Sequence, residues 1–177
     1  MVTSNLPIIG SIEYVKIKDE DIQIPAKTDT GADASAIWAS DFKIEEDGRL
    51  SFVFFDKESE LYSGKRHFAS NYKVSHVRSS NGQSQIRYCV PLEMTVCDQT
   101  FIADFNLSDR SKGRFPILIG RYALKNRFLV DVAREAFERP KNKAKSLALT
   151  EELKQDPQAF HEKYMTNEYI FNPGKPL

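Results

Sequence analysis

Residues 88–96 and 101–107 place an apolar side chain at every second position, and this alternation restricts the fold more than any other feature. The apolar members are Tyr88, Val90, Leu92, Met94, Val96, Phe101, Ala103, Phe105 and Leu107. Successive side chains of a β-strand point to opposite faces of the sheet, so a period of two predicts two strands that each bury one face. A helix would spread the same residues around its circumference, and they could not share one core.

Shorter β-rich runs recur along most of the chain and are separated by turn residues. We expect strands at 8–17, 22–27, 50–55, 72–78, 85–96, 100–107, 116–120 and 128–132. Asp47-Gly48 and Asn81-Gly82 are turn signals, residues 56–67 are polar enough for a loop, and residues 121–127 predict a brief helix. Many short strands with few helices favour an all-β sandwich or barrel.

The character of the sequence changes near residue 135. We expect a β-rich domain at 6–135, followed at 136–177 by a basic linker and a mostly helical C-terminal extension. Two helix-start signals lie in the extension. Thr150 precedes two glutamates, and Asp156 precedes Pro157, the order expected of a cap and a first helical residue.

Composition restricts the class of partner. Lys plus Arg and Asp plus Glu both number 25, so the chain offers no electrostatic reason to expect a nucleic-acid or membrane partner. A short charged linker is usually solvated, so contact with nucleic acid or the ribosome through residues 139–145 is not expected either. No signal peptide or membrane span is visible, and Cys89 and Cys97 make no disulfide framework. We expect a cytoplasmic protein.

Asp29-Thr30-Gly31 comes right after the strand expected at 22–27 and has a chemical rationale. Two such carboxylates within hydrogen-bond distance share one proton, so the ionised one can activate a water while the protonated one binds the substrate carbonyl. Gly31 allows a backbone amide to approach the carboxylate. Taken alone, the triplet also fits a loop aspartate that caps a turn. The chain has no internal repeat, so a second carboxylate must come from a second copy.

Four segments resemble a bacterial family of small retropepsin-like proteins: IPAKTDTGA, VRSSNGQSQIRY, LSDRSKGRFPILIGRYAL and FLVDVAR. Members are often labelled ATP-dependent zinc proteases and are linked with the glutamate ligase that modifies a small-subunit ribosomal protein. The resemblance runs from residue 9 to residue 134 and does not cover the extension. It implies the acid-protease fold, a closed barrel with a short helix after a glycine-arginine corner. It also implies peptide hydrolysis by an aspartate dyad formed across a homodimer.

The same resemblance assigns further residues to the site. In retropepsins an aspartate just after the catalytic loop pairs with the arginine that follows a glycine, which here gives Asp33, Gly120 and Arg121 as bracing residues. The flap that closes over substrate corresponds to Ser80, Asn81 and Gly82.

Ala32, also among the bracing residues, sets an expectation for pH. A serine at this position could donate a hydrogen bond to the catalytic carboxylate, whereas alanine cannot. We therefore expect a dyad that works nearer neutral pH.

Neither part of the family label is supported by the sequence. No His-Glu-x-x-His segment occurs, and the three histidines, at positions 67, 76 and 161, have no metal-ligand spacing. No Gly-x-x-x-x-Gly-Lys-Ser/Thr segment is present for ATP. We therefore predict no metal and no cofactor.

Several arginines stand near the expected flap and the glycine-arginine corner: Arg78, Arg87, Arg110, Arg114 and Arg121. If several of them line the cleft, they favour acidic substrates, including glutamate-rich tails. Arg78 and Arg87 are the strongest candidates for substrate binding. The alternative is that these side chains are solvated or paired with nearby carboxylates.

These observations lead to one hypothesis and two rivals. The hypothesis is an aspartic endopeptidase that acts as a homodimer on peptide or glutamate-modified amide bonds, with Asp29, Thr30 and Gly31 of both copies at its centre. The main rival is a dimeric peptide-binding module on the same scaffold, with little or no hydrolysis. Metal-dependent hydrolysis is the third alternative, and the sequence offers no ligand pattern for it.

Overall fold

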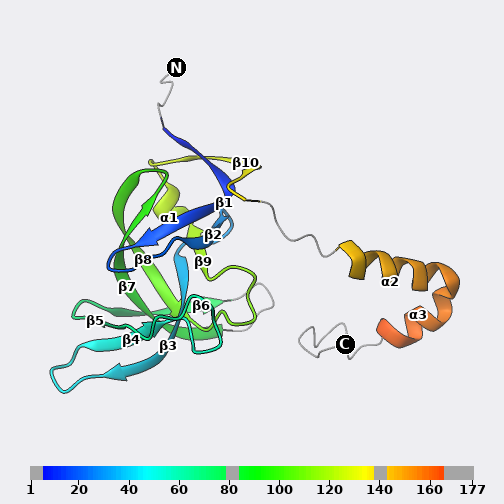
Figure 1. Cartoon of the computed structure of the whole chain (residues 1–177). Coiled ribbons are helices and arrows are strands. Elements are labelled where there is room, and N and C mark those ends of the chain that lie inside the picture. Colours follow the sequence, from blue (N-terminus) through cyan, green and yellow to red (C-terminus); the bar gives the residue numbers. More distant parts are fainter. Residues whose placement is uncertain (1–5, 79–83, 138–142, 166–177) are drawn as a thin grey trace. The chain divides into compact units, whose positions relative to one another are not determined.

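A computed structural model describes residues 6–78, 84–137 and 143–165 of the chain (Figure 1). The chain forms two compact units, Met1–Phe137 and Glu138–Leu177. The elements of the first unit are β1 (Ile8–Ile17), β2 (Ile24–Asp29), β3 (Ser35–Ile44), β4 (Leu50–Phe54), β5 (Arg66–Ala69), β6 (Lys73–Arg78), β7 (Ser84–Val96), β8 (Gln99–Ser108), β9 (Ile117–Gly120), α1 (Arg121–Leu124) and β10 (Leu129–Glu135).

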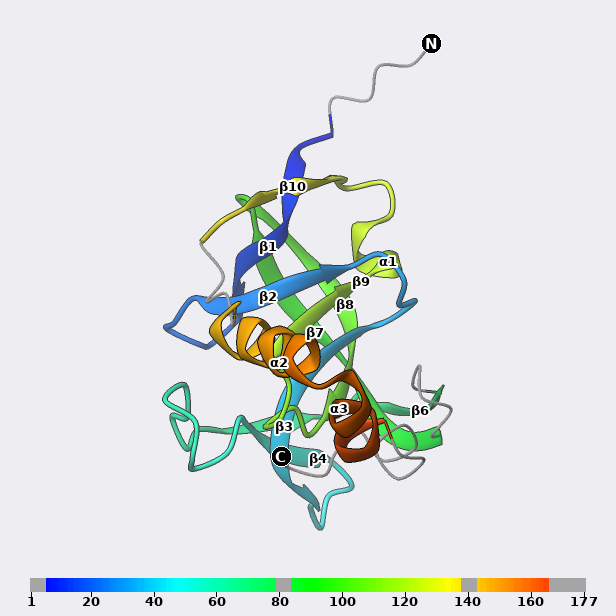
Figure 2. The same ribbon diagram turned by 90° about the vertical axis from the view of Figure 1, so that its right-hand side faces the viewer.

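Strand pairing closes six of these strands into a barrel, and their course can be followed in Figure 2. β1 pairs with β2, β2 with β9, β9 with β3, β3 with β8, and β8 with β7. β7 returns to β1 through the pairs Lys16↔Thr95 and Ile17↔Met94. Closure pairs backbone groups that an open sheet would leave at its edges. The all-β closed barrel expected from the sequence is confirmed, together with its short helix, α1.

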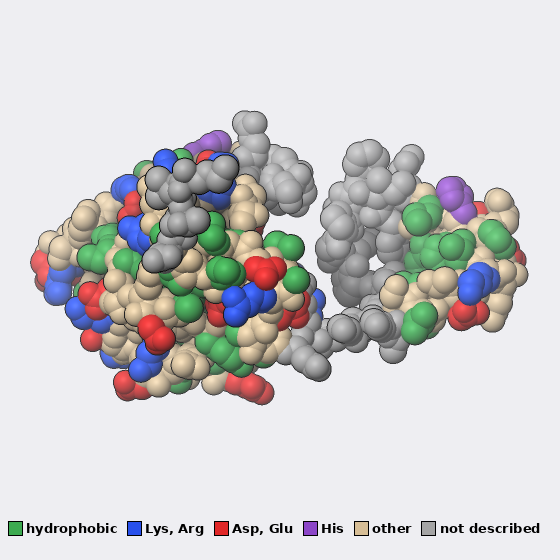
Figure 3. All heavy atoms as spheres, turned by 90° about the horizontal axis from the view of Figure 1, so that it is seen from above, with side chains coloured by type: hydrophobic (Ala, Val, Ile, Leu, Met, Phe, Trp, Pro, Cys, Tyr) green, Lys and Arg blue, Asp and Glu red, His purple; other side chains and the backbone are tan. Residues whose placement is uncertain are grey.

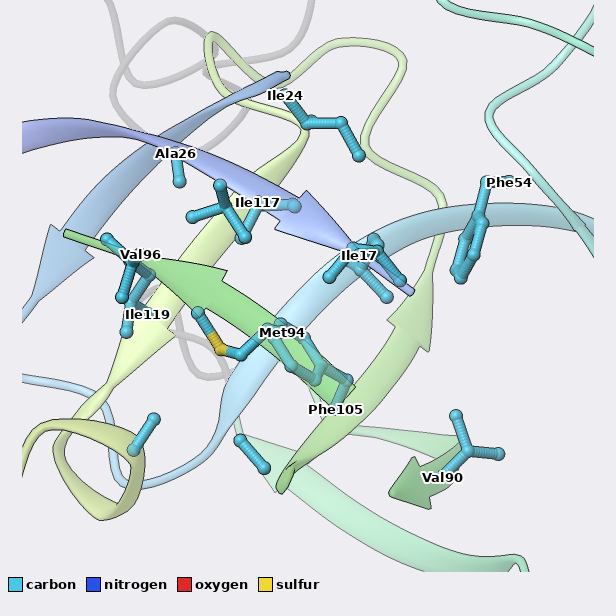
Figure 4. Close-up of a cluster of buried hydrophobic side chains, with 14 of the residues drawn as sticks. Ile17, Ile24, Ala26, Phe54, Val90, Met94, Val96, Phe105, Ile117 and Ile119 are labelled. Carbon is cyan, nitrogen blue, oxygen red and sulfur yellow. The ribbon is translucent and has the colours of Figure 1, made fainter. Parts of the chain in front are cut away.

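The two alternating stretches form the antiparallel ladder between β7 and β8, which runs from Cys89↔Asn106 to Val96↔Gln99. Their apolar faces turn into the barrel. Figure 4 shows side chains of β7 and β8 gathered with those of β1, β2 and β9: Ile17, Ile24, Ala26, Val90, Met94, Val96, Phe105, Ile117 and Ile119. The period of two in the sequence therefore marks the side of each strand that faces the core.

β9 crosses the middle of the sheet between two buried neighbours. It is parallel to β2 and antiparallel to β3, and its isoleucines Ile117 and Ile119 are both fully buried. A strand that is paired on both edges and packs against the core has a continuous apolar sequence. This run, Ile-Leu-Ile-Gly, ends at the residue that lies beside the Asp-Thr-Gly segment.

Three strands differ from the expectation. β2 begins and ends two residues later than 22–27, so Asp29 is its last residue. β3 was not expected, because the sequence gives no strand signal there: its first residues, Ser35, Ala36 and Ile37, are small or apolar and do not alternate with polar residues. All three are buried between β9 and β8. β5 begins at Arg66, inside the stretch expected to be a loop, because it pairs with β4.

The second unit is a pair of helices, α2 (Lys143–Gln155) and α3 (Pro157–Tyr164). The cap expected at Asp156 is confirmed, since its carboxylate accepts the Ala159 N–H at 2.9 Å. The start expected at Thr150 is wrong. Thr150 lies inside α2, and its hydroxyl donates to the carbonyl of Ser146.

The same unit presents apolar side chains at its surface (Figure 3), among them Leu147 and Leu153. None of the helices in the described part of the chain is both long enough and apolar enough to cross a membrane.

Truncation of Phe105 tests the assigned core. Because this side chain is fully buried, Phe105→Ala is expected to lower the free energy of unfolding by about 3–5 kcal/mol. Ile102→Ala is the matched control on the same strand, because Ile102 is 64% exposed, and it should cost less than about 0.5 kcal/mol. Urea denaturation followed by circular dichroism measures both values. Equal losses would contradict the assignment of faces.

Candidate active site

Asp29 is held at the end of β2 by sheet pairing. β2 runs parallel to β9, and the register sets Asp29 opposite Gly120. One residue earlier, the buried Thr28 hydroxyl donates to the carbonyl of Gly10 at 2.8 Å, which ties β2 to β1. The Asp29 side chain is half-buried where the strand ends. The backbone that presents this carboxylate is therefore fixed by two neighbouring strands.

The three residues that follow form a tight turn around the carboxylate. The Gly31 N–H donates to Asp29 Oδ1 at 3.2 Å, as expected for a glycine that lets the backbone approach. The Ala32 N–H donates to the backbone carbonyl of Asp29 at 3.3 Å. Thr30 and Gly31 are both exposed. The Asp-Thr-Gly loop, residues 29–31, thus presents an acid at an accessible surface.

Asp33 and Arg121 meet as the family resemblance implies. The Arg121 guanidinium donates through Nη2 to Asp33 Oδ1, and this hydrogen bond raises the pKa of Arg121. Both side chains are more than half exposed, so solvent screens the pair. Two backbone bonds hold the same segments together, from the Arg121 N–H to the Ala32 carbonyl at 2.8 Å and from the Tyr122 N–H to the Asp33 carbonyl at 3.0 Å. The backbone bonds therefore hold the loop against α1, and the ion pair adds to them.

Gly120 lets the backbone of β9 come very close to the backbone of Ala34. A Cβ at this position would lie 2.4 Å from the carbonyl carbon of Ala34 and 2.5 Å from its oxygen, so only glycine fits without backbone movement. The Gly120 N–H donates to Ser35 Oγ at 3.1 Å. Sequence reasoning missed Ser35, because this buried hydroxyl lies on the strand that showed no signal. It connects β9 to the segment after the catalytic loop.

The flap residues Ser80, Asn81 and Gly82 lie outside the described part of the chain. The strands on either side are paired in register up to Arg78↔Ser84, as expected for a hairpin. The side chain of Arg78 is likewise outside the described part, so its expected role in substrate binding stays a prediction.

Arg110 is one of the arginines that the sequence places near the expected flap and the glycine-arginine corner. Its Nε donates to the Phe115 carbonyl at 2.8 Å, which fixes the guanidinium within its own loop. Burial lowers the pKa of Arg110, the charge of Arg87 lowers it further, and the charge of Asp29 raises it. Arg110 therefore lies near enough to both groups to feel their charges. Burial also lowers the pKa of Arg87, which donates to Gln85 Oε1 at 2.8 Å.

A hollow of about 540 Å³ opens on the exposed side of the catalytic loop. It is lined by Thr30, Asp33, Arg121, Tyr122, Leu124, Lys125, Phe128 and Val130. Tyr122 is 67% exposed beside it. Among the described residues, no group of three or more His, Cys, Asp or Glu side chains is placed to hold a metal ion.

The chain is similar in sequence to a known family and to two named proteins. A family model described as "RimB-like: Retropepsin-like aspartic endopeptidase RimB" matches residues 8–141. Two relatives, from Shewanella pealeana and Shewanella halifaxensis, are each named "Probable alpha-L-glutamate ligase". They are 28% and 27% identical over 134 residues, which make up 73% of this chain and 29% of each relative. The chain thus spans under a third of the length of these relatives.

One solved structure supports the fold. The crystal structure of a protein of unknown function from Legionella pneumophila matches with a TM-score of 0.59 and 24% identity, over 73% of this chain and 95% of that chain.

Two glycine substitutions test the packing of the loop. Gly120→Ala is expected to lower the free energy of unfolding by about 3 kcal/mol or more, because the new Cβ would meet backbone atoms that cannot move aside cheaply. Gly31→Ala is the matched control. Its Cβ would lie in ordinary contact, 3.5 Å from Asp29 Oδ1, and stability should change by less than about 1 kcal/mol. Thermal and urea unfolding measure both, and a well-tolerated Gly120→Ala would refute the close approach.

Proposed function

Because the chain belongs to the RimB-like family of retropepsin-like aspartic endopeptidases, we propose that it hydrolyses peptide bonds with Asp29 and the Asp29 of a second copy. The observation that carries this proposal is the single catalytic loop, which ends a fixed strand and presents Thr30 and Gly31 at the surface. One chain supplies one carboxylate of this kind, and the reaction needs two.

The proposed chemistry follows from the two carboxylates. At hydrogen-bond distance they hold one proton between them. The ionised Asp29 takes a proton from a water molecule, which attacks the scissile carbonyl carbon, while the protonated Asp29 donates to the carbonyl oxygen. The tetrahedral intermediate breaks when a proton reaches the leaving nitrogen. The Gly31 N–H bonded to Asp29 Oδ1 keeps the carboxylate in its orientation throughout.

The surface around the loop supports a homodimer. The hollow beside Thr30 and Asp33 borders Tyr122, which a single chain leaves 67% exposed. Val130 and the buried Phe128 also line this hollow, but both pack against the core. Burying such a surface against an identical one stabilises a twofold pair and brings the two loops to the axis.

Arg110 and Arg87 support an acidic substrate. The charge of Asp29 acts on the Arg110 guanidinium, and so does the charge of Arg87, so a basic region beside the Asp-Thr-Gly loop would favour a negatively charged side chain next to the scissile bond. The relatives named as glutamate ligases fit the same chemistry, because a protein related to them would meet glutamate-rich chains. We therefore extend the proposal to glutamate-rich or glutamate-modified substrates.

Asp29→Asn is expected to abolish cleavage, because an amide cannot act as the base. Mass spectrometry of glutamate-rich and generic peptide libraries measures the products. Asp98→Asn is the matched control: Asp98 is exposed, and an asparagine tolerates its left-handed backbone (φ 59°). The control should cleave like the natural chain.

Mixing the two proteins tests the shared dyad. If every active pair needs two intact aspartates, activity falls with the square of the fraction of natural chains in an equilibrated mixture with Asp29→Asn. A linear fall would refute the dimeric site. Cleavage retained by pure Asp29→Asn would refute the assignment of Asp29. Binding of peptides without cleavage by the natural chain would favour a peptide-binding module.

Arg110→Gln tests the acidic preference. Loss of a charge-assisted hydrogen bond is expected to lower kcat/KM for a peptide with glutamates beside the scissile bond by about 10- to 100-fold. A neutral peptide should be cleaved at nearly the natural rate. Lys112→Gln removes one charge from the same loop at an exposed position and serves as the control. An equal effect on acidic and neutral peptides would contradict the proposed role.

A further inference from the structure

Three successive backbone amides at the junction of β9 and α1 hold the segment that follows the catalytic loop. The first, the N–H of Gly120, donates to a side chain, Oγ of Ser35, at 3.1 Å. The other two, at positions 121–122, donate to the backbone carbonyls of residues 32–33 at 2.8 and 3.0 Å. The Ser35 hydroxyl is therefore the one acceptor of this set that a substitution can remove.

Ser35 is a polar residue in an apolar position. It is only 1% exposed, and it lies on β3 with its backbone paired to Phe105 of β8. The backbones pass so close here that a Cβ on Gly120 would lie 2.8 Å from the Ser35 nitrogen. A hydroxyl buried in this way costs free energy unless it makes a hydrogen bond. The bond to Gly120 offsets this cost and gives the hydroxyl a task that an apolar side chain could not perform.

Two routes connect this contact with the catalytic carboxylate. The register of β2 and β9 sets Gly120 opposite Asp29. The next amide along the chain, that of Arg121, donates to the Ala32 carbonyl, and the Ala32 N–H donates back to the carbonyl of Asp29 at 3.3 Å. The position of Gly120 thus bears on both the end of β2 and the turn that follows it.

The proposed reaction needs two carboxylates at a fixed separation. Because they interact, the pair loses its protons in two separate steps, and the form with one shared proton is the active one. The gap between the two steps grows as the carboxylates approach, since repulsion between like charges rises as their distance falls. A pair that is held less firmly has a smaller gap and is active over a narrower range of pH.

We propose that Ser35 is a positioning residue of the active site, whose hydroxyl fixes the Gly120 amide and thereby holds Asp29 at the separation that the dyad requires. The catalytic part of this inference rests on the proposed function, whereas the contact between Ser35 and Gly120 is present in each chain. Ser35 is buried and acts only through the backbone that it holds.

Ser35→Ala removes the acceptor. We expect kcat to fall about 10- to 100-fold, KM to change little, and the bell-shaped profile of kcat against pH to become narrower. Ser35→Thr keeps the hydroxyl and should keep the natural width, even where its added methyl group lowers stability. An unchanged width in Ser35→Ala, or an equal narrowing in Ser35→Thr, would overturn the proposal.

Ser51→Ala is the matched control for a loss of stability alone. Ser51 lies on β4, is 0% exposed, and its Oγ donates to Glu45 Oε1 at 2.5 Å. This variant removes an equally buried hydroxyl away from the catalytic loop, so its pH profile should keep the natural width. A narrowing as large as that of Ser35→Ala would show a general effect of stability and would refute a positioning role.

The contact itself can be tested without a substrate. In Ser35→Ala, amide hydrogen exchange at Gly120 should become about tenfold faster relative to the amides of the β7–β8 ladder, and Ser51→Ala should show no such change. Unchanged protection of Gly120 would overturn the inference even if the proposed function holds. A natural chain that cleaves no peptide, or an Asp29→Asn chain that still cleaves, would overturn the proposed function and the catalytic role of Ser35 together, while exchange at Gly120 would still report the contact.

Discussion

The parallel pairing of β2 with β9 is the contact on which the proposed active site depends. It sets Asp29 level with Gly120, and the backbone of Ala34 then passes so close to Gly120 that no side chain fits between them. Neither strand can slip by one residue without turning its core isoleucines outward, since side chains alternate between faces. The position of the carboxylate is therefore a property of sheet register, and through register it depends on the packing of the whole barrel.

The Asp-Thr-Gly loop itself orients the Asp29 carboxylate. Backbone amides of Gly31, Arg121 and Tyr122 make the bonds that set its shape. The bonds from the Arg121 and Tyr122 amides join neutral backbone groups, so salt weakens them far less than the exposed ion pair of Asp33 with Arg121. Backbone bonds of this kind can keep the geometry of the loop while it is open to solvent. If two copies pair as proposed, each chain would bring a loop whose shape is already set, with Thr30 exposed beside the hollow.

Features that depend on neighbouring residues could be predicted from the sequence, whereas contacts between residues far apart in the sequence could not, unless a family pattern links them. β7 and β8 could be predicted because alternation is a local signal, and the Asp33–Arg121 contact because a family pattern links the two segments. β3 could not be predicted. It is buried between β9 and β8, so its sequence lacks the alternation of apolar and polar residues by which a strand is recognised. The charge of Asp29 raises the pKa of Arg110 although the two residues are far apart in sequence, and His67 Nε2 lies 2.7 Å from Glu20 Oε1 across 47 residues. No local pattern encodes either meeting.

The strand pairs that close the barrel differ in length. β7 and β8 share a long ladder, whereas β1 and β7 meet at only Lys16↔Thr95 and Ile17↔Met94, extended by one bond from the Lys18 N–H to the Glu93 carbonyl. A short seam of this kind opens at lower free energy than the ladders around it. The seam borders a cavity that Ile17, Lys18 and Glu93 line, whereas Asp29 lies on β2, which is paired in register with both β1 and β9. We expect the barrel to open locally along this short seam while β2 keeps its register.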